Sequence, residues 1–510
     1  MIDFIDRFLN KITMYRLTLY ALLFLLASAF GVSFFGALSF SPASLVLSLA
    51  IILGIALLVN KIFSIVFEAP TNVESVYITS FILALIITPV SPSHLFSSAG
   101  LGFFAWAAIW AMASKFIFSF NKKHIFNPAA FAVALTAFTI GQAASWWVGT
   151  LSMLPFTAAI GFLIVRKIRR LDMVLSFGVA AILFSVAFNI TKGVSPITSL
   201  LRMLAETPIV FLGTVMLTEP LTTPPTRGLR IVYGAIIGLL FPPILHLGSV
   251  YSTPELGLLV GNIFSFITGP KGRHVLKLKE KKRLTNDVYE FSFETDRKVG
   301  FLPGQYMEWT LKHDRPDNRG NRRFFTIASS PDEKEVKLGV KFYPSASSFK
   351  QALFSVRAGE TVIAAQPAGD FLLPKDKNEK VAFIAGGIGI TPFKSMVSHL
   401  ISRREKRDAV LFYSAQTPND LAYKEMFDEA GERIGLKTVY TVTSSSGPSG
   451  WNGRIGFLTR DAIREEAPDY LERTFYISGP RSLVNVFRKT LKEMGVSEAK
   501  IKTDYFPGLV

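Results

Sequence analysis

The distribution of apolar residues divides the chain into two halves of different character. Up to about Pro270 the sequence consists of long apolar runs, such as LTLYALLFLLASAFGVSFFGAL and ASLVLSLAIILGIALLV, with few charged residues between them. Each of these runs is long enough to cross a hydrocarbon core of about 30 Å as an α-helix. From Lys271 onward charged residues are frequent and the apolar stretches are short. The change predicts a domain boundary, with TGPKGRHVLKLKEKKR as the linker across it.

We expect about ten membrane-spanning helices before this boundary. Their expected centres are Leu26, Ile52, Leu83, Ala107, Leu135, Thr157, Val179, Leu204, Ala235 and Leu259. With the N-terminus inside, the basic residues Lys61, Lys115, Lys122, Lys123, the segment RKIRR, Arg227, Arg230 and the linker all lie on one side. The opposite loops hold almost nothing basic except Lys192. This asymmetry predicts an integral protein of the cell membrane with both termini in the cytoplasm. The first run is long and lacks a small-residue cleavage site, so we do not expect a removable signal peptide.

Charge and composition narrow the chemistry that the 510-residue chain can perform. The net charge of +17 fits the topology and contact with anionic membrane lipid, and no basic-aromatic patch indicates a nucleic-acid partner. The chain has no cysteine, which excludes disulfides and cysteine-ligated iron-sulfur clusters within it. The membrane half holds only His94, His124 and His246, which are not paired at helical spacing. We therefore expect no haem pair and no metal site, and an organic cofactor must carry any electrons.

The pattern of apolar and polar residues changes once more within the second half, near residue 377. Short alternating segments (HVLKLKEKKRL, VYEFSFET, QYMEWTL, VKLGVKFY and ETVIAAQP) are separated by turn residues and predict a small antiparallel barrel. Afterwards KVAFIAGG, AVLFYSA and TFYISGP alternate with helical segments, which is typical of a parallel sheet. The predicted architecture is a polytopic α-helical membrane domain (1–270), an antiparallel β-barrel domain (271–376) and an α/β domain (377–510), and the motifs described next assign FAD to the barrel and a nucleotide to the α/β domain.

The segment AGGIGITP lies between a short apolar strand and a helix that has Pro392 in its first turn. Glycines at such a place allow the backbone to approach a pyrophosphate, whose negative charge is favoured at a helix N-terminus. The expected nicotinamide dinucleotide site therefore consists of Gly386, Gly387, Gly389, Thr391 and Pro392. The later segment YSAQTPND has no arginine placed to grip a 2′-phosphate, which favours NADH while NADPH stays open.

RRFFT, GGIGITP, SGP and DYFPG, in this order, resemble the ferredoxin-NADP⁺ reductase family over about Val275 to Val510. The resemblance implies that Arg323 pairs with the FAD pyrophosphate, for which its planar guanidinium is suited. It also implies that Phe325, in place of the usual Tyr, packs on the flavin ring and that Thr326 offers a catalytic hydroxyl to the ring's N5 edge. Further flavin contacts by resemblance are Gly304, Gln305, Tyr306, Ser347 and Ser348. Near the nicotinamide it implies Gly479, Pro480 and a second catalytic residue, Ser478, in place of the usual Cys. Tyr505 and Phe506 are expected to form either an aromatic lid over the flavin or a buried C-terminal anchor.

Two polar, proline-rich segments interrupt the membrane half, NKKHIFNPAAF and LTEPLTTPPTRG. On composition alone, two capped helix ends with ordinary loops explain them equally well. In this order they resemble the flavin-carrying NqrB/RnfD membrane subunits of the Na⁺-NQR and Rnf redox complexes. The resemblance implies FMN or riboflavin near the cytoplasmic face, surrounded by Asn127, Pro128, Thr218, Glu219, Pro220, Thr222 and Thr223. It also implies FMN attachment through a phosphoester at an outward-facing threonine. The nearest match is Thr198 in GVSPITS, where Pro and Ile replace the usual Gly and Ala, so a noncovalent flavin or an ordinary loop are alternatives.

The hypothesis that unites these features is a transmembrane flavin-dependent oxidoreductase. It would pass electrons from cytoplasmic NAD(P)H through FAD to a membrane flavin, and onward to a flavinylated protein, a quinone or a metal at the outer face. A ferric-reductase arrangement is disfavoured because the haem-ligating His pairs are missing. A redox-driven transporter of Na⁺ or flavin, and a membrane-anchored NAD(P)H:quinone reductase, remain as alternatives.

Overall fold

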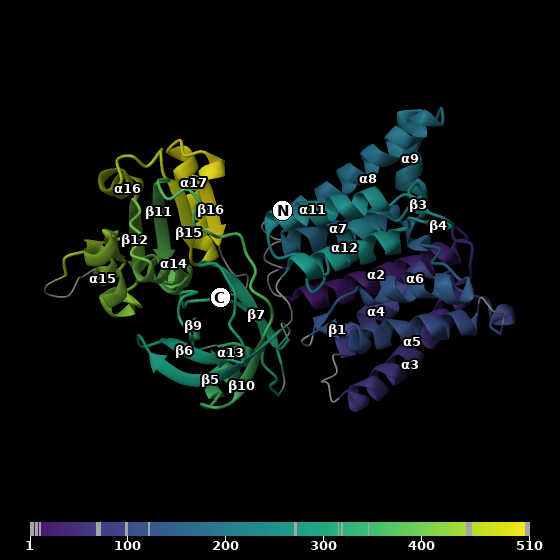
Figure 1. Ribbon diagram of the computed structural model, residues 1–510, viewed down its shortest axis with the longest axis horizontal. Helices are drawn as coiled ribbons and strands as arrows, with labels where there is room; N and C mark the ends of the chain where they lie inside the picture. Colours follow the sequence, from purple (N-terminus) through teal and green to yellow (C-terminus); the bar gives the residue numbers. More distant parts are fainter. Residues whose placement is uncertain are drawn as a thin grey trace. The chain divides into compact units, whose positions relative to one another are not determined.

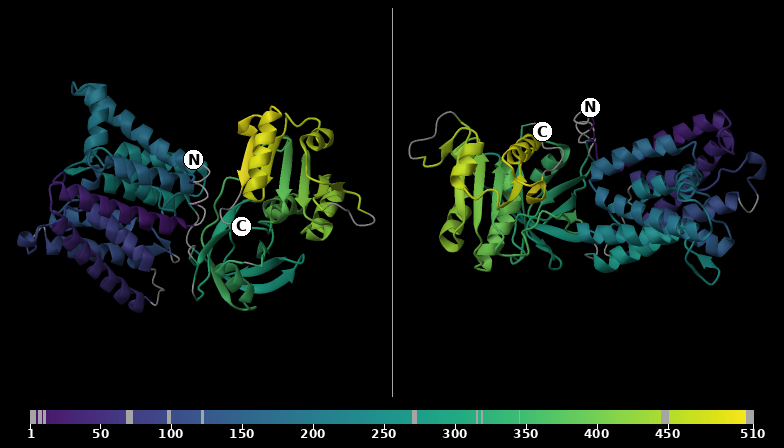
Figure 2. Two further views of the ribbon diagram at one scale, coloured as in Figure 1. Left: turned by 180° about the vertical axis from the view of Figure 1, so that it is seen from behind. Right: turned by 90° about the horizontal axis from the view of Figure 1, so that it is seen from above.

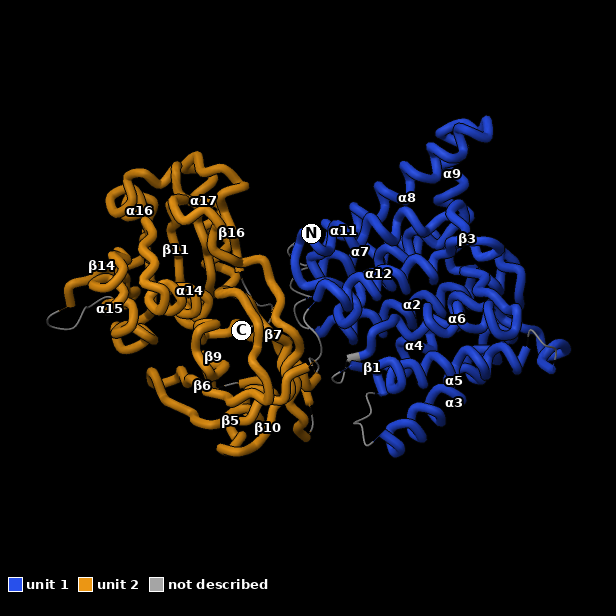
Figure 3. The backbone as a smooth tube through the Cα atoms, viewed as in Figure 1, with its two compact units in different colours: residues 1–272 blue, residues 273–510 orange. Residues whose placement is uncertain are grey.

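The computed structural model divides the chain into two compact units, Met1–Gly272 and Arg273–Val510 (Figure 3). It describes residues 12–67, 73–96, 100–120, 123–269, 273–314, 316–317, 320–344, 346–444 and 451–504, together with Ile5 and Leu9. The first unit is helical, and the second combines an antiparallel barrel with a parallel sheet (Figure 1).

Unit 1 is built from apolar helices with short connections. The helices are α2 (Met14–Phe34), α3 (Pro42–Val66), α4 (Val73–Ile86), α5 (Leu101–Ile117), α6 (Pro128–Ile140), α7 (Leu154–Ile168), α8 (Leu171–Thr191), α9 (Pro196–Glu206), α10 (Ile209–Phe211), α11 (Arg227–Leu240) and α12 (Pro254–Thr268). A π-helical turn, η3 (Leu212–Met216), continues α10. Two small hairpins pair β1 (Ser119–Phe120) with β2 (Lys123–His124) and β3 (His246–Leu247) with β4 (Val250–Tyr251). Each of the ten expected centres lies inside a different helix.

The number of membrane spans that the helix lengths support is smaller than the ten expected. Among the described residues, α2, α3 and α8 are long and apolar enough to cross a membrane. A fourth span is possible if α9 and the segment Ile209–Met216, which are bent by 70°, form one broken span. The remaining helices are shorter, and α6, α7 and α12 among them begin with a proline in the first turn. The 14 residues of α4, for example, rise only about 21 Å at ~1.5 Å per residue.

Several helices of unit 1 begin at a polar residue followed by proline. The side chains of Ser41, Asn127, Ser195 and Thr253 each accept a hydrogen bond from the backbone N–H three residues later, and proline follows each of them. Proline suits the first helical turn because an N–H at that position has no acceptor within the helix, so the N–H that proline lacks is not needed there. The NP of FNPAA and the SP of GVSPITS are therefore helix starts.

Small residues allow α8, α11 and α12 to pack closely. Gly234 and Gly238 of α11 lie four residues apart, as do Gly257 and Gly261 of α12. A Cβ atom at Gly238 would lie 2.5 Å from the backbone oxygen of Phe177 on α8. Helices in lipid associate through such close contacts, because lipid offers no hydrophobic drive to bring them together.

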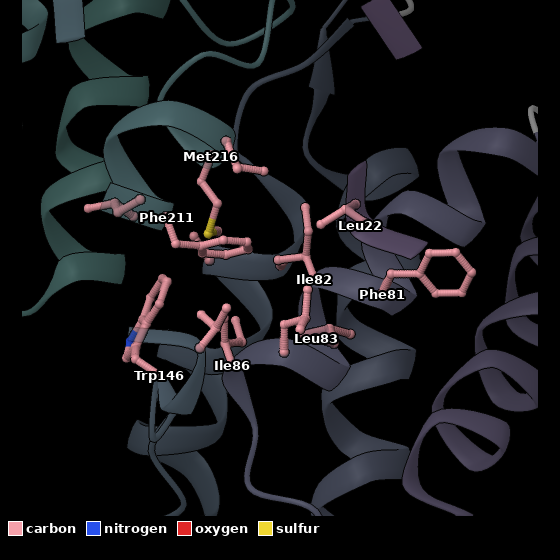
Figure 4. Close-up of a cluster of buried hydrophobic side chains, with 14 of the residues drawn as sticks. Leu22, Phe81, Ile82, Leu83, Ile86, Trp146, Phe211 and Met216 are labelled. Atoms are coloured by element: carbon pink, nitrogen blue, oxygen red, sulfur yellow. The ribbon is translucent and has the colours of Figure 1, made fainter. Parts of the chain in front are cut away.

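The core of unit 1 gathers large side chains from distant segments (Figure 4). Leu22 of α2, Leu83 and Ile86 of α4, and Phe211 and Met216 of the α10–η3 segment are almost completely buried. These contacts join the N-terminal helices to the segment that leads directly into LTEPLTTPPTRG.

The barrel of unit 2 is a six-stranded antiparallel sheet in the order β8-β7-β10-β5-β6-β9. Its elements are β5 (His274–Arg283), β6 (Val288–Thr295), β7 (Tyr306–Thr310), β8 (Arg322–Thr326), β9 (Val336–Lys341), α13 (Ser348–Ser355) and β10 (Thr361–Ala364). The edge strands meet where the N–H of Ala328 donates to the oxygen of Lys337 at 2.8 Å. The predicted barrel is confirmed.

The second sheet is six-stranded and parallel, in the order β14-β13-β12-β11-β15-β16. Its strands are β11 (Val381–Gly386), β12 (Ala409–Ala415), β13 (Lys437–Val442), β14 (Arg454–Ile455), β15 (Thr474–Ser478) and β16 (Ile501–Asp504). α14 (Thr391–Ser402) and α15 (Lys424–Ile434) pack on one face, and α16 (Arg460–Glu466) and α17 (Arg481–Glu493) on the other (Figure 2). Short turns η4 (Gly387–Ile390), η5 (Pro418–Asp420) and η6 (Glu498–Lys500) complete it. The predicted α/β domain is also confirmed.

We expect Gly238→Ala to lower the thermal stability of unit 1 by about 1–3 kcal/mol, because the new methyl group meets the Phe177 backbone. The matched control is Gly54→Ala on α3, where a Cβ meets nothing within 4 Å. Thermal unfolding of both full-length variants in detergent measures the difference. Equal melting temperatures would show that the α8–α11 contact is not tight.

Candidate functional site

The flavin motif lies on strand β8, and Arg323 is held firmly there. Its Nη2 donates to both carboxylate oxygens of Asp317 at 2.8 Å, and its Nη1 donates to the oxygen of Gly320 at 2.9 Å. The guanidinium lies 5.4 Å from the centre of the Phe349 ring, next to the start of α13. The sequence analysis did not anticipate Asp317, which lies in the loop before β8.

The start of α13 belongs to the same cluster. Ser347 is its N-cap and accepts from the N–H of Lys350. The hydroxyl of Ser348 accepts from the N–H of Asp317 at 2.9 Å and lies 3.0 Å from Nε2 of His313. Asp317 thereby connects Arg323 with the N-terminus of α13. A guanidinium group and a helix N-terminus both favour phosphate.

The two phenylalanines of RRFFT face opposite sides of the strand. Phe325 is half-buried against the barrel core, with its ring 5.8 Å from that of Phe349. Phe324 is 45% exposed and meets Tyr306 edge-on at 5.6 Å. Thr326 is buried and pairs with Tyr306 across the β7–β8 ladder. The expected contact of Phe325 with the flavin stays a prediction, and Phe324 is a second aromatic ring that the sequence analysis did not consider.

The LPGQY turn is locked against a segment that the sequence analysis missed. Gly304 has φ +94, and a Cβ there would lie 2.1 Å from the oxygen of Phe371. Gln305 donates through Nε2 to the oxygen of Gly369 at 3.2 Å. Gly369 has φ +114 and lies against the Tyr306 ring. In the sequence, the segment PAGD after β10 is typical of a turn and could have indicated this contact.

The dinucleotide loop lies at the carboxyl end of β11, between β12 and β15. The chain runs from β11 outward to β14 on one side and returns to β15 on the other, so this end is the switch point where ligands bind in such sheets. Gly386 ends the strand, Gly387 adopts φ +53, and Thr391 and Pro392 begin α14. The structure therefore brings the predicted dinucleotide residues together at one edge.

The SGP segment touches this loop directly. A Cβ at Gly389 would lie 2.5 Å from both the Cα of Gly479 and the oxygen of Ser478. At Gly386 it would lie 3.3 Å from Cδ of Pro480. Ser478 is buried at the end of β15. Tyr505 and Phe506 lie outside the described residues.

In unit 1 the two polar segments meet around the carboxylate of Glu219. Its Oε2 accepts from Nδ2 of Asn127 at 3.0 Å and from the hydroxyl of Thr222 at 3.2 Å. Its Oε1 lies 3.1 Å from Nε2 of His124. The predicted residues Asn127, Glu219 and Thr222 are thus brought together, and His124 joins them from the same quoted segment.

The other polar groups of this cluster bond within the chain. The N–H of Asn127 donates to Oδ1 of Asn262 at 2.7 Å, and Asn262 donates to the hydroxyl of Tyr233 at 3.1 Å. Thr218 donates to the oxygen of Thr214 at 2.8 Å, and Thr223 accepts from Arg170. Pro128 begins α6, and Pro220 accepts from Thr223. A flavin contact of these residues stays a prediction.

Thr198 lies in the first turn of α9 and is exposed. Its N–H donates to the hydroxyl of the N-cap residue Ser195 at 3.1 Å, and the two hydroxyls lie 2.8 Å apart. The backbone role of GVSPITS is therefore a helix start, and the hydroxyl of Thr198 is accessible.

The part of the chain that is similar to known proteins is unit 2. Residues 275–372 match the oxidoreductase FAD-binding domain, and residues 383–489 match the oxidoreductase NAD-binding domain. The reductase subunit of glycine betaine monooxygenase from Chromohalobacter salexigens is 28% identical over 233 residues, which is 45% of this chain and 62% of that protein. NADH-cytochrome b5 reductase 1 from Ajellomyces capsulatus is 27% identical over 254 residues, 47% of this chain and 81% of that protein. The chain thus spans about three fifths of the betaine relative. Among solved structures, Amycolatopsis cytochrome P450 reductase GcoB aligns with 25% identity and a TM-score of 0.42, over 46% of this chain and 69% of that one.

We expect Gly389→Ala to slow reduction of bound FAD by NADH at least tenfold, because the methyl group forces the loops of β11 and β15 apart. FAD content should not change. Gly300→Ala, where a Cβ meets nothing within 4 Å, is the control. Anaerobic stopped-flow absorbance measures the rate, and an unchanged rate in the Gly389 variant would count against the dinucleotide site.

We expect Arg323→Lys to lower FAD affinity about tenfold, because lysine keeps the charge but loses the planar fork. The neighbouring Arg322→Lys, at a residue that pairs with Glu308 at 3.3 Å, is the control. The flavin-to-protein ratio after gel filtration measures retention. Equal retention in both variants would remove Arg323 from the FAD site.

The described residues fit the two cofactors that the matched domains bind. Arg323 and the N-terminus of α13 offer groups suited to the FAD pyrophosphate, and the glycine loop of β11 offers a backbone without side chains to a dinucleotide. Unit 2 is therefore a FAD- and NAD-binding oxidoreductase module of the ferredoxin-reductase type.

Proposed function

We propose that the protein is a membrane-bound electron-transfer enzyme in which the reductase module delivers electrons to the helical unit. The observation that carries this proposal is the continuity of the chain: one polypeptide joins the FAD- and NAD-binding domains to a unit with three long apolar helices. Bound FAD supplies the conversion of a two-electron hydride donor into single electrons. The residues of the module bind and orient the two cofactors.

The helical unit is proposed to be polytopic, with about ten membrane segments and both termini in the cytoplasm. The helices at all ten expected centres support this. The shorter ones fit a membrane protein if they are buried among their neighbours or line a cavity, where broken helices are tolerated. α4, whose residues Phe81 to Ile86 are all buried, meets that condition.

The first acceptor in unit 1 is proposed to be FMN or riboflavin beside the Glu219 cluster. Two polar segments from distant parts of the sequence converge there on a partly buried carboxylate with several donors, and ionised groups within membrane segments are costly and often functional. The terminal acceptor at the outer face belongs to one of three classes: a flavinylated protein, a quinone or a metal. NADH is the proposed donor, since a relative carries NADH in its name and no arginine follows β12 in YSAQTPND.

Two alternatives compete with this proposal. A transporter would use the redox reaction to move Na⁺ or a flavin, and its turnover would depend on sodium. An anchored NAD(P)H:quinone reductase would use the helical unit only for attachment and would reduce its acceptor on the cytoplasmic side.

The test uses full-length protein in liposomes that enclose ferricyanide, with NADH added outside. NADH then reacts only with molecules whose unit 2 faces outward. We expect reduction of the enclosed ferricyanide. We also expect Glu219→Gln to slow this at least tenfold while leaving the reduction of external ferricyanide unchanged, because only the path through unit 1 is altered.

Glu429→Gln, which removes a surface ion pair on α15, is the control and should behave like the wild type. Reduction of external acceptors alone, with no enclosed ferricyanide reduced, would overturn the proposal in favour of the anchored quinone reductase. A strict sodium requirement would favour the transporter.

A further inference from the structure

Helix α14 lies between the flavin motif and the dinucleotide loop. It begins at Thr391, directly after the glycine loop, and Lys394, Ser395 and Met396 in its first turns are all buried. Lys394 and Ser395 contact residues 329–333, which follow the flavin strand β8. One helix therefore contacts the segments next to both cofactor sites.

The first half of α14 is tied to the backbone beside the flavin motif. The buried hydroxyl of Ser395 donates to the oxygen of Ser329 at 2.6 Å. Ser329 is three residues after Thr326, and Ser395 is four residues after Thr391. Met396 provides a second contact, since a Cβ at Gly304 would lie 2.5 Å from its Cε. These contacts connect the flavin motif with the dinucleotide loop through only a few residues.

An ion pair between the buried Lys394 and the partly exposed Glu333 reinforces this half. Nζ of Lys394 lies 3.4 Å from Oε1 of Glu333, which also accepts from the N–H of Ser330 at 2.8 Å. Lys337 binds the other oxygen of Glu333 at 2.8 Å. Burial lowers the pKa of Lys394, and the charge of Glu333 opposes that shift. Removing Glu333 would leave the buried ammonium group of Lys394 without this partner, which is costly, so the pair favours contact between the helix start and the loop.

The second half of α14 is tied to Asp332. Its Oδ2 accepts from the hydroxyl of Ser402 at 2.7 Å and lies 2.6 Å from Nδ1 of His399, and its Oδ1 lies 3.4 Å from Arg403. The hydrogen bonds from Ser402 and His399 lower the pKa of Asp332 to about 2. The carboxylate is therefore ionised at neutral pH. Together with Glu333 it fixes the helix at both ends.

We infer that Asp332 and Ser395 are positioning residues for hydride transfer: they set the spacing between the flavin strand and the dinucleotide loop by locking α14 onto residues 329–333. Reacting atoms must approach to about 3–3.5 Å, and a displacement of about 1 Å costs up to a hundredfold in rate. A loosened helix would shift the dinucleotide loop relative to β8 without removing a cofactor contact. The inference concerns reduction of FAD within unit 2, so it does not depend on electron transfer to unit 1.

The pair of Lys394 with Glu333 leaves 8% and 28% of the two side chains exposed, and that of His399 with Asp332 leaves 21% and 34% exposed. The pair of Arg403 with Asp332 is more open, at 61% and 34%. The pair of Arg433 with Glu429 on α15 leaves 61% and 49% of the two side chains exposed. Exposed pairs contribute little. A variant in this pair therefore controls for the loss of a carboxylate elsewhere in unit 2.

The test measures FAD reduction by NADH in the full-length protein in detergent, by anaerobic stopped-flow absorbance. Asp332→Asn and Ser395→Ala are compared with the wild type. We expect the limiting rate of FAD reduction to fall at least tenfold in Asp332→Asn, while the apparent Kd for NADH changes less than twofold. The long-wavelength charge-transfer absorbance between the nicotinamide and the flavin should weaken in parallel. Asp332→Glu should restore part of both signals.

Ser395→Ala changes no charge and keeps the test valid if Asp332→Asn does not fold. Glu429→Gln should keep the wild-type rate and absorbance. Wild-type rates in both α14-contact variants, with full flavin content, would overturn the inference. An equal loss of rate in Glu429→Gln would overturn it as well. So would loss of FAD from both variants, because these residues would then retain the flavin rather than set the spacing.

Discussion

The close approach of two backbone turns at the carboxyl ends of β11 and β15 is the constraint on which unit 2 depends. Gly389 and Gly479 meet where any side chain would collide, at 2.5 Å from a Cβ. Because they meet, the glycine loop stays at the switch point of the sheet and α14 begins directly beside it. The helix then extends along residues 329–333 of the barrel. A parallel sheet and an antiparallel barrel thereby become one compact unit in which α14 contacts the segments next to both cofactor motifs.

Unit 1 depends on a different constraint, the cost of the partly buried carboxylate of Glu219 in a unit built from apolar helices. A charged group out of water needs several donors to offset lost hydration. Glu219 obtains them from Asn127, His124 and Thr222, and Asn127 in turn is held by Asn262 of α12. The two polar loops and the last helix are thus tied together at one point, while glycine contacts hold α8, α11 and α12 elsewhere.

Local features of the chain were predictable, and pairings between distant segments were not. Alternation placed β6 over Val288–Thr295, and a buried run placed β12 over Ala409–Ala415, because strand patterns depend on neighbouring residues. Helix centres in unit 1 were also found, but their lengths were overestimated, since apolar composition does not reveal where prolines and polar residues end a helix. The contact of Asn127 with Asn262 joins residues 135 positions apart. The contact of Arg323 with Asp317 depends on a loop conformation, and neither leaves a local signal.

Some residues of the proposed flavin motif in unit 1 also stabilise the fold, so their substitution does not test flavin binding alone. Asn127 caps α6 through its Oδ1, donates to Glu219 through its Nδ2 and donates its backbone N–H to Oδ1 of Asn262. Its substitution would disturb the helix start and the carboxylate together, so a lost flavin and a lost fold would look alike. Thr198 is different, because its hydroxyl is exposed and Ser195, not Thr198, caps α9. Flavin chemistry in the helical unit is therefore best judged at positions such as Thr198, where the fold makes little use of the side chain.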